Sequence, residues 1–221
     1  MTGEPSSGLW RPGAPTWDSR WRALAAQVYA GVRDRNLGRE AAFDLACFLM
    51  DWAQPDPVIS ELAQESAEGS HPERLLELAR QALTLAAFVP DFELEPRFLT
   101  TLELYLAVVA ADLRATGLDG PVRLVILEGG EPPHAYLQHN SSFGHTSGLA
   151  PSDGDGSNPL AALVLVADEL QDAVMTSLMA VWPVCPRHHL GAHPRATADA
   201  AAWWCKGGVR HDICTIGRWG G

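Results

Sequence analysis

The spacing at which apolar residues recur changes once along this 221-residue chain, near Gly117, and this change constrains the fold more than any other feature. Before Gly117, apolar side chains return every three or four residues, as in amphipathic helices. After it, a short run with β-branched residues, 122–127, indicates a strand. We therefore predict an α+β protein, in which an N-terminal all-helical domain is followed by a small strand-helix module.

Five helices are predicted ahead of Gly117, each bounded by residues that start or stop a helix. They cover residues 18–35 and 39–53, a segment starting at Pro57, residues 70–88, and residues 96–116. Asp56 is the expected N-cap of the third helix, and Gly117 is the expected left-handed stop of the fifth. We place the helical domain at residues 17–117, after a Pro-, Gly- and Ser-rich segment, residues 1–16, that we expect to be disordered.

The rest of the chain, residues 118–221, is predicted to be an α+β module. Residues 134–139 are expected to form a strand beside 122–127, and the Ser-, Gly- and Asp-rich stretch 140–158 is expected to be a loop. Asn158 is the expected cap of a sixth helix, with Asp168, Glu169 and Asp172 on its solvent side. The module is predicted to end in a metal-binding β-hairpin within residues 182–219.

Composition indicates the compartment and the class of partner. No apolar run reaches the roughly 18 residues of a membrane span, and the N-terminus does not resemble a signal peptide, so we expect a soluble, cytoplasmic protein. A net charge of -11 disfavours nucleic acid and anionic membranes, which leaves another protein as the expected partner. Residues from Cys185 onward carry five cations and two carboxylates, so a weak nucleic-acid contact through this basic tail is a third hypothesis.

Cysteine and histidine spacing in the tail indicates a metal site. Cys185 and His188 stand in a Cys-x2-His turn, a size that lets two side chains reach one tetrahedral ion. Cys205 and His211 bracket five residues that include Gly207 and Gly208, and a hairpin turning at these glycines would bring the two side chains back opposite each other. The four residues predict one structural Zn²⁺ site.

Other residues of the tail compete for the same role. His193 is the alternate for His188. Cys214 is the alternate for Cys205, but alternation along a strand would point Cys214 away from His211, so we interpret it as a packed thiol. A separate metal site at His134, His139 and His145 is weighed as well, although solvent exposure of these histidines is the simpler interpretation.

The residues Trp182-Pro183-Val184-Cys185-Pro186-Arg187-His188, with His193, Trp203-Trp204-Cys205, His211 and Ile216-Gly217, resemble a C-terminal module of uncharacterised bacterial proteins, of an actinobacterial type. That module is similar to a zinc ribbon, and the resemblance covers roughly residues 160–219. It implies Cys185, His188 or His193, Cys205 and His211 as zinc ligands, and it implies no activity. The helical half resembles no family that we recognise.

Function follows less directly than the metal site. Two thiolates and two imidazoles usually close the coordination shell of zinc, and the chain has no His-Glu-x-x-His helix, so we expect a non-catalytic interaction or regulatory module. The alternative is a zinc-dependent hydrolase or biosynthetic enzyme with an open metal site. In that case His193, Asp199 or Asp212 would complete the site.

Overall fold

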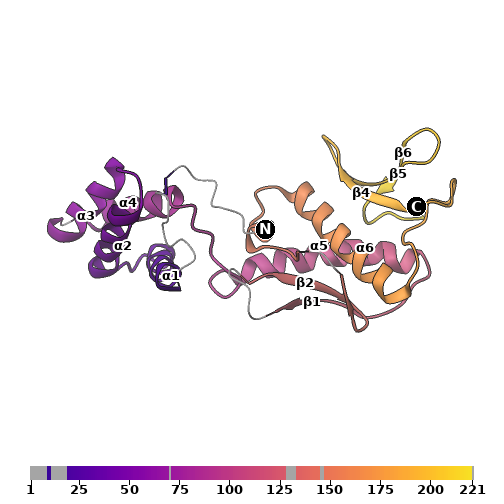
Figure 1. Ribbon diagram of the computed structural model, residues 1–221, viewed down its shortest axis with the longest axis horizontal. Coiled ribbons are helices and arrows are strands. Elements are labelled where there is room, and N and C mark those ends of the chain that lie inside the picture. The colour runs from indigo at the N-terminus through magenta and orange to yellow at the C-terminus, as the bar shows by residue number, and fades with distance from the viewer. Residues whose placement is uncertain (1–8, 11–18, 70, 128–132, 145–146, 221) are drawn as a thin grey trace. The chain divides into compact units, whose positions relative to one another are not determined.

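A computed structural model describes residues 9–10, 19–69, 71–127, 133–144 and 147–220. The chain divides into two compact units, Met1–Pro90 and Asp91–Gly221, and each has its own apolar core (Figure 1). The α+β class predicted from the sequence is confirmed. No helix in the described ranges has the length and apolar character required to cross a membrane.

The first unit is built from helices that follow the predicted ones closely. They are α1 (Ser19–Arg33), α2 (Arg39–Trp52), α3 (Pro57–Glu68) and α4 (Pro72–Leu85). The Asp56 carboxylate accepts a hydrogen bond from the Val58 amide at 2.8 Å, so it caps α3 as predicted. The predicted start of the fourth helix, Ser70, lies outside the described residues.

The apolar stripes of α1 to α4 meet in one core. Its largest fully buried side chains are Leu45, Leu49, Ile59, Leu62 and Leu78. Ahead of α1, Trp10 pairs with Ala53 through a β-bridge, and its ring centre lies 5.1 Å from that of Trp21. The remainder of residues 1–16, where we expect disorder, lies outside the described residues.

The second unit places helices beside two antiparallel sheets. The helices are α5 (Pro96–Ala115) and α6 (Pro159–Leu178). The first sheet contains β1 (Val122–Ile126), β2 (Ala135–His139) and β3 (Ser142–Phe143), and the second contains β4 (Ala192–Ala196), β5 (Ala201–Cys205) and β6 (His211–Thr215). Leu124 of β1 lies opposite Leu137 of β2, which confirms the predicted pair of strands.

Helix α6 lies between the two sheets and also packs against α5 (Figure 1). The Asn158 side chain accepts a hydrogen bond from the Ala161 amide at 3.2 Å, so it caps α6 as predicted. Because neighbours surround it on several sides, α6 buries more than one stripe. Glu169, expected on the solvent side, is only 6% exposed, so that expectation was wrong.

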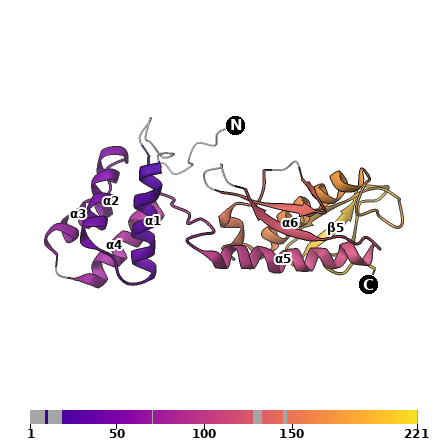
Figure 2. The same cartoon turned by 90° about the horizontal axis from the view of Figure 1, so that it is seen from below.

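Helix α5 belongs to the second unit, whereas the sequence suggested that it completes an N-terminal domain ending at residue 117. Its buried side chains share one core with α6, the first sheet and the tail. Figure 2 shows α5 running along one side of this unit. Periodicity reveals that a helix has an apolar face, but it does not reveal which elements cover that face.

The segment 140–158 has more structure than the predicted loop. It contains β3, a β-bridge between Ala135 and Leu149, and the 3-10 helix η1 (Pro151–Gly154), which packs against α5. Leu149 is buried, and Gly154 lies so close to the Phe98 carbonyl that a Cβ would not fit there. Gly154 therefore permits close packing of η1 on α5.

A buried carboxylate on α5 holds the second sheet. Asp112 is completely buried and accepts hydrogen bonds from the Trp203 indole, the Gly217 amide and the Trp219 amide, at 2.7, 2.7 and 2.8 Å. Each carboxylate oxygen has at least one donor, which offsets the cost of burying the charge. Asp112 therefore ties the strand β5 and the chain end to α5.

A buried amide on α6 holds the other edge of the same sheet. The Gln171 side chain donates hydrogen bonds to the carbonyls of Trp182 and Ala192, each at 2.7 Å. The Trp182 indole in turn donates to the Thr116 hydroxyl at 2.9 Å. These contacts fix the chain on both sides of the loop that begins at Cys185.

Candidate metal centre

The first of the loops that carry Cys and His side chains runs from Cys185 to Leu190, just before β4. The Cys185 amide donates to the Leu190 carbonyl, and the His189 amide donates to the Cys185 carbonyl, each at 2.8 Å. These bonds close the loop on itself. Cys185 Sγ lies 3.9 Å from His188 Nδ1 across the turn, as the Cys-x2-His spacing predicts.

The second loop joins β5 to β6 and brings Cys205 opposite His211, its partner in the strand register. Gly208 has a φ of 53°, a left-handed conformation that glycine adopts without strain. The Gly207 amide donates to Cys205 Sγ at 3.3 Å. The predicted hairpin turning at the two glycines is therefore confirmed.

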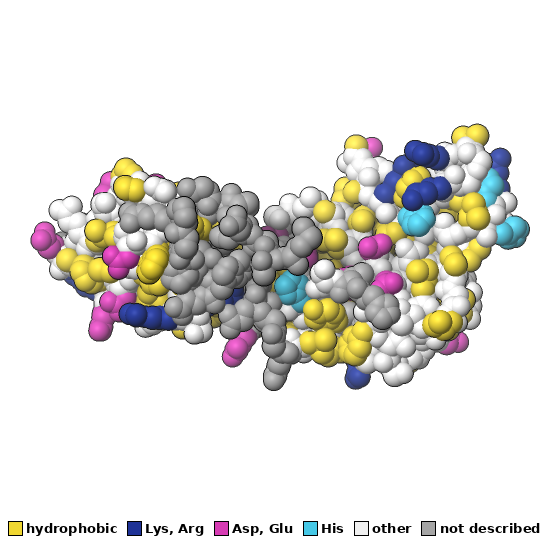
Figure 3. All heavy atoms as spheres, viewed as in Figure 1, with side chains coloured by type: hydrophobic (Ala, Val, Ile, Leu, Met, Phe, Trp, Pro, Cys, Tyr) yellow, Lys and Arg dark blue, Asp and Glu magenta, His cyan; other side chains and the backbone are white. Residues whose placement is uncertain are grey.

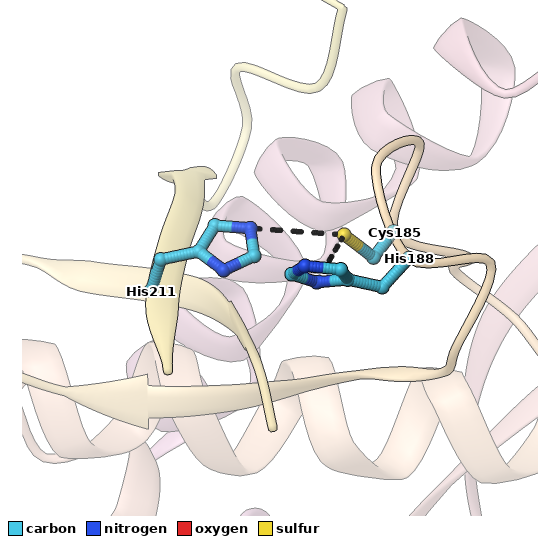
Figure 4. Close-up of side chains that lie close together, drawn as sticks. All are labelled: Cys185, His188 and His211. Atoms are coloured by element: carbon cyan, nitrogen blue, oxygen red, sulfur yellow. Dashed lines mark hydrogen bonds between the residues drawn. The ribbon is translucent and has the colours of Figure 1, made fainter. Parts of the chain in front are cut away.

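The side chains of both loops converge at one end of the sheet. Cys185 Sγ lies 3.7 Å from His211 Nε2, and Cys205 Sγ lies 3.5 Å from His188 Nδ1. Cys185, His188 and His211 point toward one another in Figure 4, with one ligand atom of each within 4.8 Å of the others. Cys185 and Cys205 are fully buried, while the imidazoles are partly exposed.

The spacing of these atoms suits a tetrahedral ion. With Zn–S near 2.3 Å and Zn–N near 2.0 to 2.1 Å, neighbouring sulfur and nitrogen ligands should lie about 3.6 Å apart. The three sulfur–nitrogen separations are 3.5, 3.7 and 3.9 Å. His188 Nδ1 faces both sulfurs, and Cys185 Sγ faces both imidazoles. Cys185, His188 and His211 thus form one group of mutually close ligand atoms, and Cys205 contacts His188 of that group without being a member of it.

A second hydrogen bond sets the tautomer of His211. Its Nδ1 lies 3.2 Å from the Val209 carbonyl, which can only accept, so Nδ1 carries the proton. The unprotonated Nε2 then faces Cys185 with its lone pair. Metal-bound histidines usually donate their other ring N–H in this way, which orients the ring and raises its basicity.

The surroundings of Cys185 favour the ionised form of its thiol. Burial alone would raise its pKa, but the backbone amides of His188 and Arg187 donate to the sulfur, and together with the neighbouring Cys205 and His211 side chains they outweigh burial and lower the pKa of Cys185. Burial, together with the nearby His211 and Arg187, lowers the pKa of His188. At neutral pH these shifts favour a thiolate and a neutral imidazole, the forms that bind metal.

Close approach of the two loops depends on Gly207. A Cβ at this position would lie 2.9 Å from both the Cβ and the Cγ of His188, and 2.9 Å from Leu190 Cδ1. Contacts that short do not occur for a real Cβ, so a larger residue would push the first loop away. Gly207 is buried between the loops.

The alternates for the ligands lie away from this cluster. His193 pairs with Trp204 in the register and is exposed, while its neighbour Ala192 shares the buried side with Cys205. Cys214 packs against the core of the unit. Burial and the Asp112 carboxylate raise the pKa of Cys214 to about 11, so its thiol stays protonated at neutral pH.

The carboxylates considered for an open site are also elsewhere. Asp212 lies 2.7 Å from Arg195 Nη2 and 2.9 Å from its Nε, and it alternates with His211 along β6. Asp199 is exposed in the turn between β4 and β5. Within the described ranges, no other three Cys, His, Asp or Glu side chains approach one another as closely as the cluster does.

Among the histidines weighed as a second metal site, His134 and His139 belong to no such group of described residues. His139 is fully buried, not exposed as we expected, and burial lowers its pKa. His134 is partly exposed, and His145 lies outside the described residues.

The sequence missed some residues that position the site. Asp112 follows Val109 by three residues and so continues the buried stripe of α5, a pattern that could have marked it as a buried acid. Gln171 had no comparable signature, because its partners are backbone carbonyls of the tail.

Comparison with known proteins adds no family to this picture. Searches against protein-family models, curated proteins and solved structures found no match. One part of the resemblance seen in the sequence is supported, namely the presence of a metal site. The C-terminal sheet carries a Cys and His cluster that can hold a metal ion such as zinc.

Proposed function

We propose that the tail binds one structural Zn²⁺ through Cys185, His188, Cys205 and His211, in an arrangement similar to a zinc ribbon. The separations of 3.5 to 3.9 Å between the sulfur and nitrogen atoms carry this proposal. Two thiolates with two imidazoles in a tetrahedral arrangement favour zinc over the oxygen-seeking metals. Two thiolates also cancel the charge of the ion, so a neutral group would sit at the end of the sheet.

We further propose that the protein acts by binding another protein, with the metal holding the binding element in shape. Four protein ligands leave no coordination position for a substrate or a reactive water. Asp199 and Asp212, the carboxylates that an enzyme would need near such a water, lie outside the cluster. These observations favour a binding role over the alternative of a zinc-dependent enzyme.

The test is the metal content and coordination of the full-length protein, purified under reducing conditions. We expect one zinc per chain, and an X-ray absorption spectrum with two sulfur and two nitrogen scatterers at about 2.3 and 2.0 Å. Cys185→Ser and Cys205→Ser should each lose most of the zinc. Cys214→Ser should retain it, because that thiol packs against the core.

Cys47→Ser is the matched control, since this thiol lies in α2 of the other unit and should not affect metal content. An oxygen scatterer in the zinc shell would favour the enzyme instead. Full zinc occupancy in both Cys185→Ser and Cys205→Ser would rule out the proposed ligands.

A further inference from the structure

The two metal loops carry exposed side chains that neither the metal cluster nor the core uses. We call them the loop-tip surface: Arg187 and Leu190 from the first loop, and Lys206, Val209 and Arg210 from the second. Leu190 is 51% exposed and Val209 is 85% exposed. Aliphatic side chains this exposed, set among cations, mark a surface suited to a partner.

The two tips form one continuous surface because the loops touch. Leu190 Cδ1 lies against Gly207, and His188 lies against Gly207 and Gly208, so the first loop rests on the second. His188 also belongs to the metal cluster, so the cluster adjoins this contact. An ion bound there would hold the loop-tip surface together.

The charge of the loop tips is opposite to that of the chain. Residues 185–191 and 205–211 contain three cations and no carboxylate, in a protein of net charge -11. The zinc group itself would be neutral. Figure 3 shows dark-blue Lys and Arg side chains gathered over the C-terminal sheet of this unit. Because the loop tips are positively charged, electrostatic complementarity favours a negatively charged partner.

We infer that the loop-tip surface binds an acidic segment of another protein, in which carboxylates flank an apolar side chain. This inference rests on the proposed function, whose partner it specifies. Lys206 and Arg210 lie on either side of Val209 along the loop, so the bound segment has the inverse pattern. The apolar contact supplies affinity, and the flanking charges supply selectivity.

The same surface does not suit a nucleic acid. Single strands bind through aromatic rings that stack on bases, together with a track of cations. The apolar residues here, Leu190 and Val209, are aliphatic. The neighbouring indole of Trp204 is already covered by Arg195 and Lys206, whose charged groups lie 5.2 and 5.5 Å from its ring centre.

The experiment is a selection from a random peptide display library on the zinc-loaded, full-length protein. We expect enriched peptides with Asp or Glu on both sides of an aliphatic or aromatic residue. The tightest peptide is then labelled, and its affinity is measured by fluorescence anisotropy. We expect about a tenfold loss with Val209→Ser, and a larger loss when Lys206→Glu and Arg210→Glu are combined.

Arg218→Glu is the matched control, because this exposed cation lies beyond Thr215, at the opposite end of β6 from His211. It should leave the affinity unchanged. An oligothymidylate of the same charge as the peptide should bind more weakly than the peptide.

The inference is overturned if selected peptides are not acidic, if the double charge reversal leaves their affinity unchanged, or if the oligothymidylate binds at least as tightly. Zinc content is measured in the same samples. If the protein contains one zinc per chain and any of those outcomes occurs, only the inference is contradicted. If the protein takes up no zinc, the proposed function is contradicted as well.

Discussion

At the residue scale, the cluster depends on a glycine as much as on its ligands. Gly207 is where the two loops touch, and a Cβ there would overlap His188 and Leu190. Its amide also donates to Cys205 Sγ. Such supporting contacts typically change metal affinity by 10- to 100-fold when they are lost.

We therefore expect Gly207→Ala to weaken zinc binding about tenfold, since the added methyl displaces His188 from the two sulfurs. Competition with a chromophoric chelator measures this affinity. Gly38→Ala is the control, because a Cβ at Gly38 meets no atom within 4 Å. If the zinc affinity of the variant equals that of the unchanged protein, the first loop can move to accommodate the methyl group without weakening zinc binding.

Residue spacing could predict which side chains face the cluster only in part. The sequence left His193 open as an alternate for His188, because no strand was predicted there. The register places His193 opposite Trp204, on the exposed side of the sheet. For Cys214 the expected alternation was wrong. A register shift between Trp203 and Trp204 pairs Cys214 with Trp203, so Cys214 lies on the same face of the sheet as His211, further along the strand. Its environment is set by Asp112, from a helix about a hundred residues earlier.

At the element scale, α5 and α6 hold the sheet that carries the cluster. Asp112 satisfies three donors of the tail from a completely buried position. Removing the carboxylate leaves those donors without their acceptor, and buried donors without partners destabilise a fold.

We expect Asp112→Ala to lower the free energy of unfolding of the Asp91–Gly221 unit by roughly 3 kcal/mol. Urea titration followed by tryptophan fluorescence measures this loss. Glu103→Ala, an exposed acid on the same helix, should change it little. Equal effects of the two substitutions would show that the hydrogen bonds to Asp112 contribute no net stability.

Strand β4 shows where local patterns fail. The segment Ala192–Ala196 contains Pro194 and no β-branched residue, so it was not predicted as a strand. It is an edge strand of the order β4-β5-β6, and an edge tolerates a residue that lacks an N–H. The Gln171 bond to the Ala192 carbonyl and its pairing with β5 hold it in place.

At the scale of the whole molecule, the two units have separate cores, and the metal cluster belongs to one of them. Metal bound only to the folded state stabilises it by mass action, by about 4 kcal/mol at a thousandfold excess over the dissociation constant. That stabilisation should act on the Asp91–Gly221 unit alone.

Hydrogen exchange measured segment by segment, before and after chelation, tests this expectation. Amides of β4, β5 and β6 should exchange up to about 1,000-fold faster without metal. Amides of α1 to α4 should keep their protection and serve as the internal control. Equal loss of protection in both units would contradict a local role for the metal.

The sequence by itself determined the α-helices, the strand pair β1 and β2, and the two loops of the metal site. Helix caps, apolar spacing and the Cys-x2-His turn act between near neighbours, so residues such as Asp56, Asn158 and Cys185 could be assigned from local chemistry.

Only the tertiary structure decided which unit α5 joins, that β4 exists as a strand, and that Asp112 and Glu169 are buried. Each of these depends on contacts between segments far apart in the chain. A periodic pattern shows that a surface must be covered, and the packing of the whole unit determines what covers it.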